Sequence, residues 1–332
     1  MAKKEKSFGD TIRDIVGDSA IIEDLEREVK AIPTGSLALD VSIGAGGIPK
    51  GRFTEIFGVE SAGKTTLALS IIKNGFESGT IDSFLYVDTE NNLNLGYVKS
   101  LLGEYIGRGL IVQPLSAEDA FSVSLKGVEE GIDLIIFDSV GSLSPSKELE
   151  DDFTQQHVGL VPRLMSKFLR MAGGKVRENN TAFVFINQVR DNIGTYYGGL
   201  TTPAGHALRH FLSLRIQLSK GKDIEDKETV IGNLVNFTIK KNKVGVPFRT
   251  AFTNNIYGTG IDYYRDVINF GTLLGVVESR ASYFAFEGTT IGSKPGLLNT
   301  AISLSENREL LDKIVRECYN TAKVKLPEYL HE

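Results

Sequence analysis

The chain has 332 residues, of which 41% are hydrophobic, and a formal net charge of −5. This length and apolar content suit a full α/β core with one or two small appended domains, and they exclude disordered and fibrous proteins. Because the net charge is slightly acidic, any nucleic-acid binding must come from local basic clusters. A single cysteine and four histidines exclude a disulfide framework and a zinc cluster. With neither a long apolar run nor a signal-type N-terminus, the sequence predicts a cytoplasmic protein with no membrane partner.

The first predicted element is an amphipathic segment at 8–30, in which apolar residues such as Ile12, Ile15 and Ile22 recur at helical spacing. Four strands follow at 52–57, 83–88, 134–138 and 182–186. Their residues are apolar on both faces, as in buried parallel strands covered by helices. Further strands, at 212–218, 234–240 and 249–253, alternate in the manner of antiparallel additions. We therefore expect a mixed, mostly parallel central sheet.

Past Gly260 the pattern predicts a small α+β lobe, with a helix at 267–274, short strands around 283–286 and a final helix at 306–322. The expected organisation is an oligomerisation segment at 1–33, an α/β core at 34–261 and a C-terminal domain at 262–332. Two stretches, about 150–159 and 190–205, are rich in glycine, threonine and glutamine and resist assignment. Long loops within a compact domain are usually functional.

The strongest motif is Gly-Val-Glu-Ser-Ala-Gly-Lys-Thr-Thr at 58–66, which lies between a predicted strand and a predicted helix. Such a loop points backbone N–H groups at phosphate oxygens and opens a helix whose N-terminus favours anions. Lys64 would contact the β and γ phosphates, and the Thr65 hydroxyl would bind Mg²⁺. The alternative interpretation is a chance glycine turn. The nucleotide-binding residues of this motif are Gly58, Glu60, Ser61, Ala62, Gly63, Lys64, Thr65 and Thr66.

Three other strand ends carry polar residues that an NTPase needs. Asp138 and Ser139 close the strand at 134–138, where the carboxylate would hold Mg²⁺. Glu90 follows the strand that ends at Asp88, and it is the candidate that activates the attacking water. Gln188 closes the strand at 182–186 and would sense the γ phosphate. The alternatives are a helix cap for Asp138, a solvated loop residue for Glu90 and an ordinary polar turn for Gln188.

Lys241 and Lys243 follow another predicted strand. They would serve as cationic fingers at the triphosphate or form a solvated face. The sequence leaves both interpretations open.

Several stretches, in order and at matching spacing, resemble the bacterial and phage RecA recombinases from about residue 8 to 325. They are Thr-Gly-Ser-Leu-Ala-Leu-Asp at 34–40, Gly-Ala-Gly-Gly-Ile-Pro at 44–49, the phosphate loop, Phe-Ile-Asn-Gln-Val-Arg at 185–190 and Lys-Asn-Lys at 241–243. The resemblance implies a P-loop NTPase fold and an ATP- and Mg²⁺-dependent filament. Such a filament pairs single-stranded DNA with homologous duplex DNA and exchanges strands.

The resemblance also assigns roles to residues. It implies that Glu90 activates water, that Gln188 senses the γ phosphate, and that Lys241 and Lys243 reach the neighbouring protomer's triphosphate. Tyr97 matches the aromatic residue that stacks on adenine. Asn94 stands where the family has an aspartate, which would relax base selectivity.

The resemblance implies that the two unassigned stretches are DNA-binding loops. Val158 and Ile193 match apolar wedges between base triplets, which unstack bases at a cost that is offset by new contacts. The remaining contact positions would grip the DNA backbone independently of sequence. These positions are Arg163, Ser166, Arg170, Arg190, Gly194, Thr201, Thr202, Gly205 and His206.

The chain also departs from the family pattern. Asp191 and Asn192 replace an apolar and a basic residue, Pro203 and Ala204 replace small flexible residues, and His210 replaces an interface phenylalanine. The chain ends at Glu332 without an acidic tail, so we expect less autoinhibition. Three other functions fit the phosphate loop. They are a hexameric helicase or motor on the same core, a regulatory filament that hydrolyses ATP poorly, and a small-molecule kinase.

Overall fold

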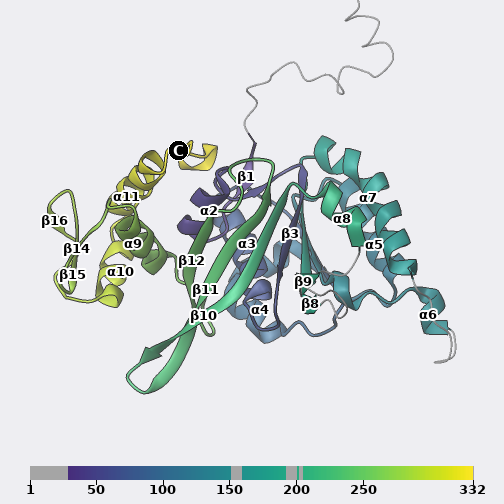
Figure 1. The fold of residues 1–332 in the computed structure, drawn as a ribbon, viewed down its shortest axis with the longest axis horizontal. Coiled ribbons are helices and arrows are strands. Elements are labelled where there is room, and N and C mark those ends of the chain that lie inside the picture. Colours follow the sequence, from purple (N-terminus) through teal and green to yellow (C-terminus); the bar gives the residue numbers. More distant parts are fainter. Residues whose placement is uncertain (1–28, 151–158, 192–199, 202–204, 332) are drawn as a thin grey trace, which may run out of the picture.

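The computed structural model describes residues 29–150, 159–191, 200–201 and 205–331 (Figure 1). Residues 8–28 of the expected helix at 8–30 and the predicted DNA contacts Val158, Ile193, Gly194 and Thr202 lie outside these residues, and residues 29–30 are not helical. Of the predicted N-terminal segment, β1 (Ala31–Ile32) is described, and it pairs antiparallel with β2 (Ile48–Pro49) of the same chain.

Among the described residues, nine strands form the central sheet in the order β13-β12-β11-β10-β3-β7-β6-β4-β5. The six strands from β10 to β5 are parallel to one another, and β11, β12 and β13 add antiparallel. The predicted mixed, mostly parallel sheet is therefore confirmed. The strands are β3 (Arg52–Gly58), β4 (Phe84–Asp88), β5 (Gly109–Val112), β6 (Leu134–Asp138), β7 (Ala182–Gln188), β10 (Leu214–Asp226), β11 (Thr229–Asn242), β12 (Thr250–Ile256) and β13 (Gly260–Ile261).

Helices cover both faces of this sheet, because the central strands are apolar on both sides. On one face lie α2 (Leu37–Ile43), α3 (Lys64–Glu77), α4 (Leu95–Leu102) and η2 (Gly103–Arg108). On the other lie α5 (Ala117–Glu129), α7 (Leu160–Glu178) and α8 (Gly205–Phe211), as Figure 1 shows. Phenylalanines such as Phe183 and Phe185, with ring centroids 4.6 Å apart, fill this second layer. Two short elements, η3 (Val140–Ser142) and α6 (Ser146–Glu150), follow β6.

The C-terminal residues form a separate lobe with its own apolar cluster. Its elements are α9 (Tyr263–Leu273), β14 (Glu278–Arg280), β15 (Tyr283–Phe286), β16 (Thr289–Thr290), α10 (Leu297–Ser305), α11 (Arg308–Thr321) and η4 (Glu328–Leu330). Leu37 and Val41 of α2 belong to the same cluster, so α2 joins the lobe to the core. Across the described part of the chain, none of the helices combines the length and apolarity that a membrane span requires.

The hairpin of β10 and β11 is longer than the sequence predicts. Leu218 of β10 is level with Gly58 at the end of β3, and the hairpin continues past this point to Asp226 and Thr229 (Figure 1). Beyond Leu218 the residues of β10 are mostly charged and exposed, so the apolar pattern of this strand stops while its backbone pairing continues. The hydrophobic pattern therefore underestimates strand length here.

Candidate active site

The phosphate loop connects β3 to α3 as predicted, and its glycines meet specific backbone demands. A Cβ on Gly58 would lie 2.4 Å from the carbonyl oxygen of Leu218, so a side chain there would displace the neighbouring strand. Gly63 caps α3 with a φ of +89°, which favours glycine. The loop thus presents backbone amides at the N-terminus of a 14-residue helix, which is a favourable site for phosphate groups. Glu60 and Ser61 are exposed, and Ala62 is buried beneath the loop.

Lys64 is buried, and its ammonium lies against the loop itself. Its Nζ donates to the carbonyl oxygens of Val59 at 2.7 Å and Gly58 at 3.3 Å. Burial lowers the pKa of Lys64, and the nearby carboxylates of Asp138 and Glu90 oppose that shift. A cation partly withdrawn from water beside a helix N-terminus gains more from a phosphate ligand than an exposed lysine would.

Thr65 and Asp138 lie together, as the two-motif prediction requires. The Thr65 hydroxyl donates to Asp138 Oδ2 at 3.3 Å, and Tyr86 of β4 donates to the same oxygen at 2.6 Å. Burial raises the pKa of Asp138 to about 6, with Glu90 and Asp88 adding repulsion. A hydroxyl and a carboxylate fit Mg²⁺, which prefers oxygen ligands and is usually held by one or two carboxylates plus substrate phosphates. Within the described ranges, no group of three or more His, Cys, Asp or Glu side chains is placed to hold a metal.

Glu90, Ser139 and Gln188 are brought together from three strand ends. Ser139 Oγ donates to Glu90 Oε1, and Gln188 Nε2 donates to the same oxygen at 3.0 Å. The carboxylate of Glu90 therefore faces the ends of β6 and β7. This arrangement favours a catalytic carboxylate over the solvated loop residue that the sequence left open.

Two supporting residues were missed by sequence analysis. Asp88, at the end of β4, accepts hydrogen bonds from the backbone N–H groups of Glu90 at 3.1 Å and Asn91 at 3.0 Å. Gln113 donates to the other oxygen of Asp88 at 2.9 Å. These contacts shape the turn that carries Glu90. An acidic residue closing a buried strand was the available signal for Asp88, whereas Gln113 follows β5, which the sequence did not predict.

Tyr97 lies beside the phosphate-loop helix, where its hydroxyl is 2.8 Å from the hydroxyl of Thr66. Asn94 is the N-cap of α4, and its side-chain oxygen accepts from the backbone N–H of Tyr97 at 3.0 Å. Asn94 therefore positions Tyr97, a role that an aspartate would also fill.

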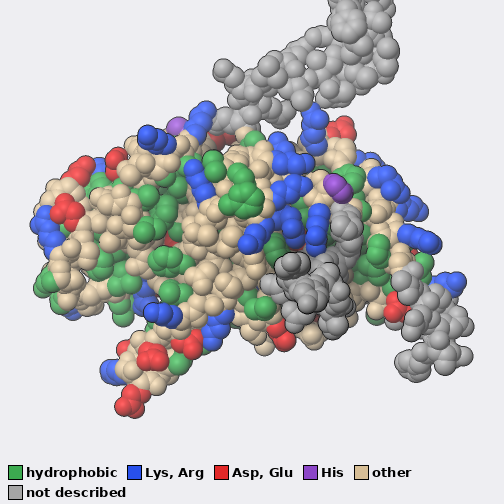
Figure 2. Space-filling model, viewed as in Figure 1, with side chains coloured by type: hydrophobic (Ala, Val, Ile, Leu, Met, Phe, Trp, Pro, Cys, Tyr) green, Lys and Arg blue, Asp and Glu red, His purple; other side chains and the backbone are tan. Residues whose placement is uncertain are grey.

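Lys241 and Lys243 are not placed at the phosphate loop of their own chain. In the sheet register, Lys241 of β11 lies opposite Arg215 of β10. Arg215 in turn lies opposite Glu55 of β3, three residues before Gly58. The Nζ of Lys241 donates to the carbonyl oxygen of Arg209 in α8 at 2.6 Å. Burial lowers the pKa of Lys241, and the positive charges of Lys243 and Arg215 lower it further. Figure 2 shows Lys and Arg side chains gathered over the central strands next to α8.

The predicted DNA contacts that are described belong to two places. Arg163, Ser166 and Arg170 lie on α7 at spacings of three and four, which put them on one helix face, and both arginines are exposed. The backbones of Arg190 and Thr201 pair in a short ribbon of β8 (Arg190–Asp191) and β9 (Leu200–Thr201). Gly205 and His206 begin α8.

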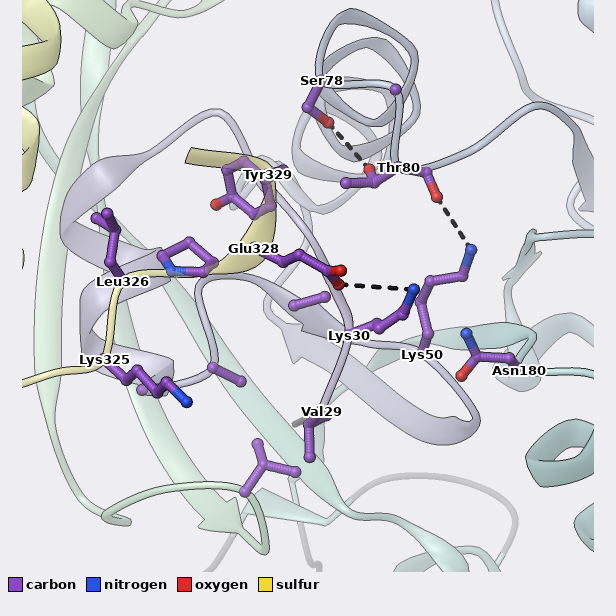
Figure 3. Close-up of a pocket in the computed structure, with 16 residues that line it drawn as sticks. Val29, Lys30, Lys50, Ser78, Thr80, Asn180, Lys325, Leu326, Glu328 and Tyr329 are labelled. Atoms are coloured by element: carbon purple, nitrogen blue, oxygen red, sulfur yellow. Dashed lines mark hydrogen bonds and ion pairs between the residues drawn. The ribbon is translucent and has the colours of Figure 1, made fainter. Parts of the chain in front are cut away.

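A cavity of about 550 Å³ lies at the opposite edge of the sheet, away from these residues. It is lined by the chain entering β1, the turn after α3 and the C-terminal segment 325–329. Glu328 pairs there with Lys30 at 3.5 Å, and Lys50 donates to the Thr80 carbonyl oxygen at 3.0 Å (Figure 3).

Comparisons with known proteins agree with this geometry. Residues 1–262 match the RecA N-terminal domain family. The chain is 40% identical to "Protein RecA" of Thermus aquaticus, covering 94% of this chain and 93% of that protein. It is 38% identical to "Protein RecA" of Thermotoga sp. (strain RQ2), covering 99% and 92%. It is 36% identical to "Protein RecA" of Caldanaerobacter subterraneus subsp. tengcongensis, covering 97% and 93%.

Identities of this size over nearly the whole of both chains favour a recombinase over a hexameric motor built on the same core. A phosphate loop, a carboxylate at a neighbouring strand end and a partly buried glutamate beside a glutamine are the parts that such an ATPase requires. The chain therefore belongs to the RecA family, the nucleotide-binding, DNA-dependent ATPases that act in homologous recombination and DNA repair.

Proposed function

We propose that this chain binds ATP with Mg²⁺ at the phosphate loop and hydrolyses it with Glu90 as the residue that activates water. Lys64 and the loop amides would hold the β and γ phosphates, and Thr65 and Asp138 would hold the ion. Bound Mg²⁺ would neutralise charge on the phosphate oxygens. Ser139 would orient Glu90, Gln188 would report the γ phosphate, and Tyr97, positioned by Asn94, would stack on adenine. The shared hydrogen bonds of Glu90 with Ser139 and Gln188 carry this proposal.

The second part of the proposal concerns the assembly. Lys241 and Lys243 would complete the catalytic site of the next protomer. Within one chain Lys241 lies level with Glu55 in the middle of β3, and the chain from there to Lys243 runs away from the phosphate loop. The segment at 1–33 would contact that neighbour. A contact between two different surfaces of identical chains does not close on itself and generates a helix or a ring.

The third part is DNA binding by a filament of these chains on single-stranded DNA, which it would pair with homologous duplex. The exposed arginines of α7 and the segment at about 190–205 would contact phosphates, and the loop at about 150–159 would supply the apolar wedge at Val158. We also propose the three-part organisation of 1–33, 34–261 and 262–332 and a cytoplasmic location. The separate apolar cluster of the C-terminal lobe supports the last domain boundary.

Electron microscopy of the protein with single-stranded DNA and a non-hydrolysable ATP analogue tests the assembly. The expected result is an extended right-handed helix with bound DNA, and Lys64→Ala should prevent its formation. Discrete six-membered rings would support the motor instead. Single-turnover hydrolysis with and without DNA then separates the recombinase from a filament that binds ATP but hydrolyses it poorly.

A further inference from the structure

Glu55 is a charged residue in the middle of β3, and its side chain is fully buried. In register it lies beside Phe185 of β7 and Arg215 of β10, and along its own strand it shares a face with Phe53 and Phe57. A buried ion pair adds little stability compared with well-packed apolar residues of similar size. The location of this carboxylate among phenylalanines therefore needs an explanation other than stability.

The two oxygens of Glu55 contact two different strands. Asn187 Nδ2 of β7 donates to Oε1 at 3.0 Å, and Arg215 Nε of β10 donates to Oε2 at 2.5 Å. The guanidinium of Arg215 also lies over the ring of Phe57, 4.5 Å from its centroid, which fixes its orientation. Because β3 lies between β7 and β10 in the sheet, one carboxylate holds both neighbouring strands.

These two contacts are made at the ends of one chain segment. Asn187 is the second-last residue of β7, and Arg215 is the second residue of β10. The chain between these strands contains β8, β9 and α8 and includes the second predicted DNA loop. Glu55 thus joins the two stems from which that loop leaves the sheet.

The same contact leads to the catalytic pair. The side-chain oxygen of Asn187 accepts from the backbone N–H of Gln188 at 3.1 Å, and consecutive strand residues face opposite sides of the sheet. Asn187 therefore faces Glu55, whereas Gln188 faces Glu90. A shift of the loop stems that moves the side-chain amide of Asn187 should therefore also move Gln188.

We propose that Glu55 is a positioning residue, which couples the stems of the second DNA loop to the Gln188–Glu90 pair through Asn187 and Arg215. This inference rests on the proposed role of residues 190–205 in DNA binding. It predicts that Glu55 determines how strongly DNA stimulates ATP hydrolysis, and that it affects the affinity for ATP little.

The test compares turnover with and without single-stranded DNA in Glu55→Gln, which keeps the size of the side chain and removes its charge. The ratio of stimulated to unstimulated turnover should fall about tenfold, the factor expected for loss of a charged hydrogen bond. The KM for ATP should stay within about threefold of wild type, because no nucleotide contact changes. An unchanged ratio would overturn the proposal.

A matched control is Asp133→Asn, which breaks the 2.8 Å ion pair between Lys50 and Asp133 at the opposite edge of the sheet. This variant should keep the wild-type ratio. An equal fall in both variants would indicate general weakening of the sheet and reject a specific role for Glu55.

Two more variants keep the proposal testable if Glu55→Gln does not fold. Arg215→Lys keeps the positive charge but loses the Nε donor, and it should also lower the ratio. Asn187→Ala combined with either variant should lower the ratio no further than the stronger single change, because all three act through one connection. Independent, additive losses would contradict the proposal. If wild-type hydrolysis is not stimulated by DNA at all, the proposed function fails rather than the role of Glu55.

Discussion

Gln188 Nε2 and Glu90 Oε1 are joined by a 3.0 Å hydrogen bond, although the two residues are 98 positions apart in the chain. The contact connects the end of β7, from which the second predicted DNA loop begins, to the turn after β4. The carboxylate proposed to activate water and the amide proposed to sense the γ phosphate thus share one hydrogen bond. A movement of either side chain therefore alters the hydrogen bonding of the other.

Replacement of Glu90 by glutamine should stop hydrolysis without stopping nucleotide binding. The amide cannot accept a proton from water, so turnover should fall by about 10²- to 10⁴-fold. Affinity for ATP, measured by fluorescence titration, should change little because Glu90 holds neither the phosphate-loop amides nor Lys64. Glu104→Gln removes an exposed carboxylate from η2 and serves as the control. Normal hydrolysis by the Glu90 variant would show that another group is the base.

Binding of Mg²⁺ should depend on pH through Asp138. Its pKa is raised to about 6, chiefly by burial, and the ion needs the ionised carboxylate. Below pH 6 the Mg²⁺ affinity of the nucleotide-free protein should fall about tenfold for each pH unit, as expected for one linked proton. Isothermal titration between about pH 5 and 8 measures this slope. This range extends from about one pH unit below the pKa of Asp138 to about two units above it. An affinity that does not change with pH would contradict the assignment.

Asp138 should also lower the free energy of unfolding at neutral pH. The folded-state pKa of Asp138 lies above its value in the unfolded chain, so ionisation favours unfolding as the pH rises from about 4 to 6. At pH 7 the full cost is present, and Asp138→Asn should unfold at a higher temperature than wild type in the absence of nucleotide. At pH 4 the advantage should largely disappear. The exposed hairpin variant Asp223→Asn should show no such pH-dependent gain.

Two inactive variants should restore activity when mixed, if Lys241 acts on the neighbouring protomer. Glu90→Gln supplies an intact Lys241, and Lys241→Ala supplies an intact Glu90. In a random equal mixture, roughly a quarter of the interfaces between protomers would carry both intact residues. Steady-state ATPase assays of the mixture should therefore recover up to that share of wild-type turnover. Recovery no greater than the sum of the separate variants would place both residues in the same site of one chain.

Tyr329 should hold the C-terminal segment against the core. Its hydroxyl donates to the Gly46 carbonyl oxygen at 2.6 Å, next to the Lys30–Glu328 pair of Figure 3. Tyr329→Phe should lower the free energy of unfolding by about 1 kcal/mol and speed amide exchange in residues 325–331. Tyr283→Phe, which changes an exposed side chain, should change neither quantity. Unchanged exchange in the first variant would show that the segment is held by other contacts.

The parts of the site that sequence could predict are the ends of buried parallel strands. Mostly apolar runs predict where β3, β4, β6 and β7 lie, and the polar residues that follow them must then meet at one edge. This reasoning located Lys64, Asp138, Glu90 and Gln188. The chemistry of a phosphate loop is encoded within nine consecutive residues, so it needs no knowledge of long-range contacts.

The parts that sequence could not predict depend on register between distant strands. Tyr86 reads as an ordinary buried aromatic residue until its hydroxyl is placed against Asp138. Glu55 breaks the apolar pattern of β3, but its partners are 132 and 160 positions away. The positions of Lys241 and Lys243 along the sheet follow from pairing with Arg215 and from irregularities in the β10–β11 ladder. No local periodicity specifies such pairings.

The placement of Lys241 level with Glu55 has a consequence for the two tips of any assembly. If the lysine pair of one protomer serves the triphosphate of the next, as proposed, the last protomer at one tip holds nucleotide that no lysine pair reaches. The protomer at the other tip presents lysines with no triphosphate to contact. The two tips are thus chemically different. The rates of growth and shortening at the two tips should therefore depend differently on whether the bound nucleotide has been hydrolysed.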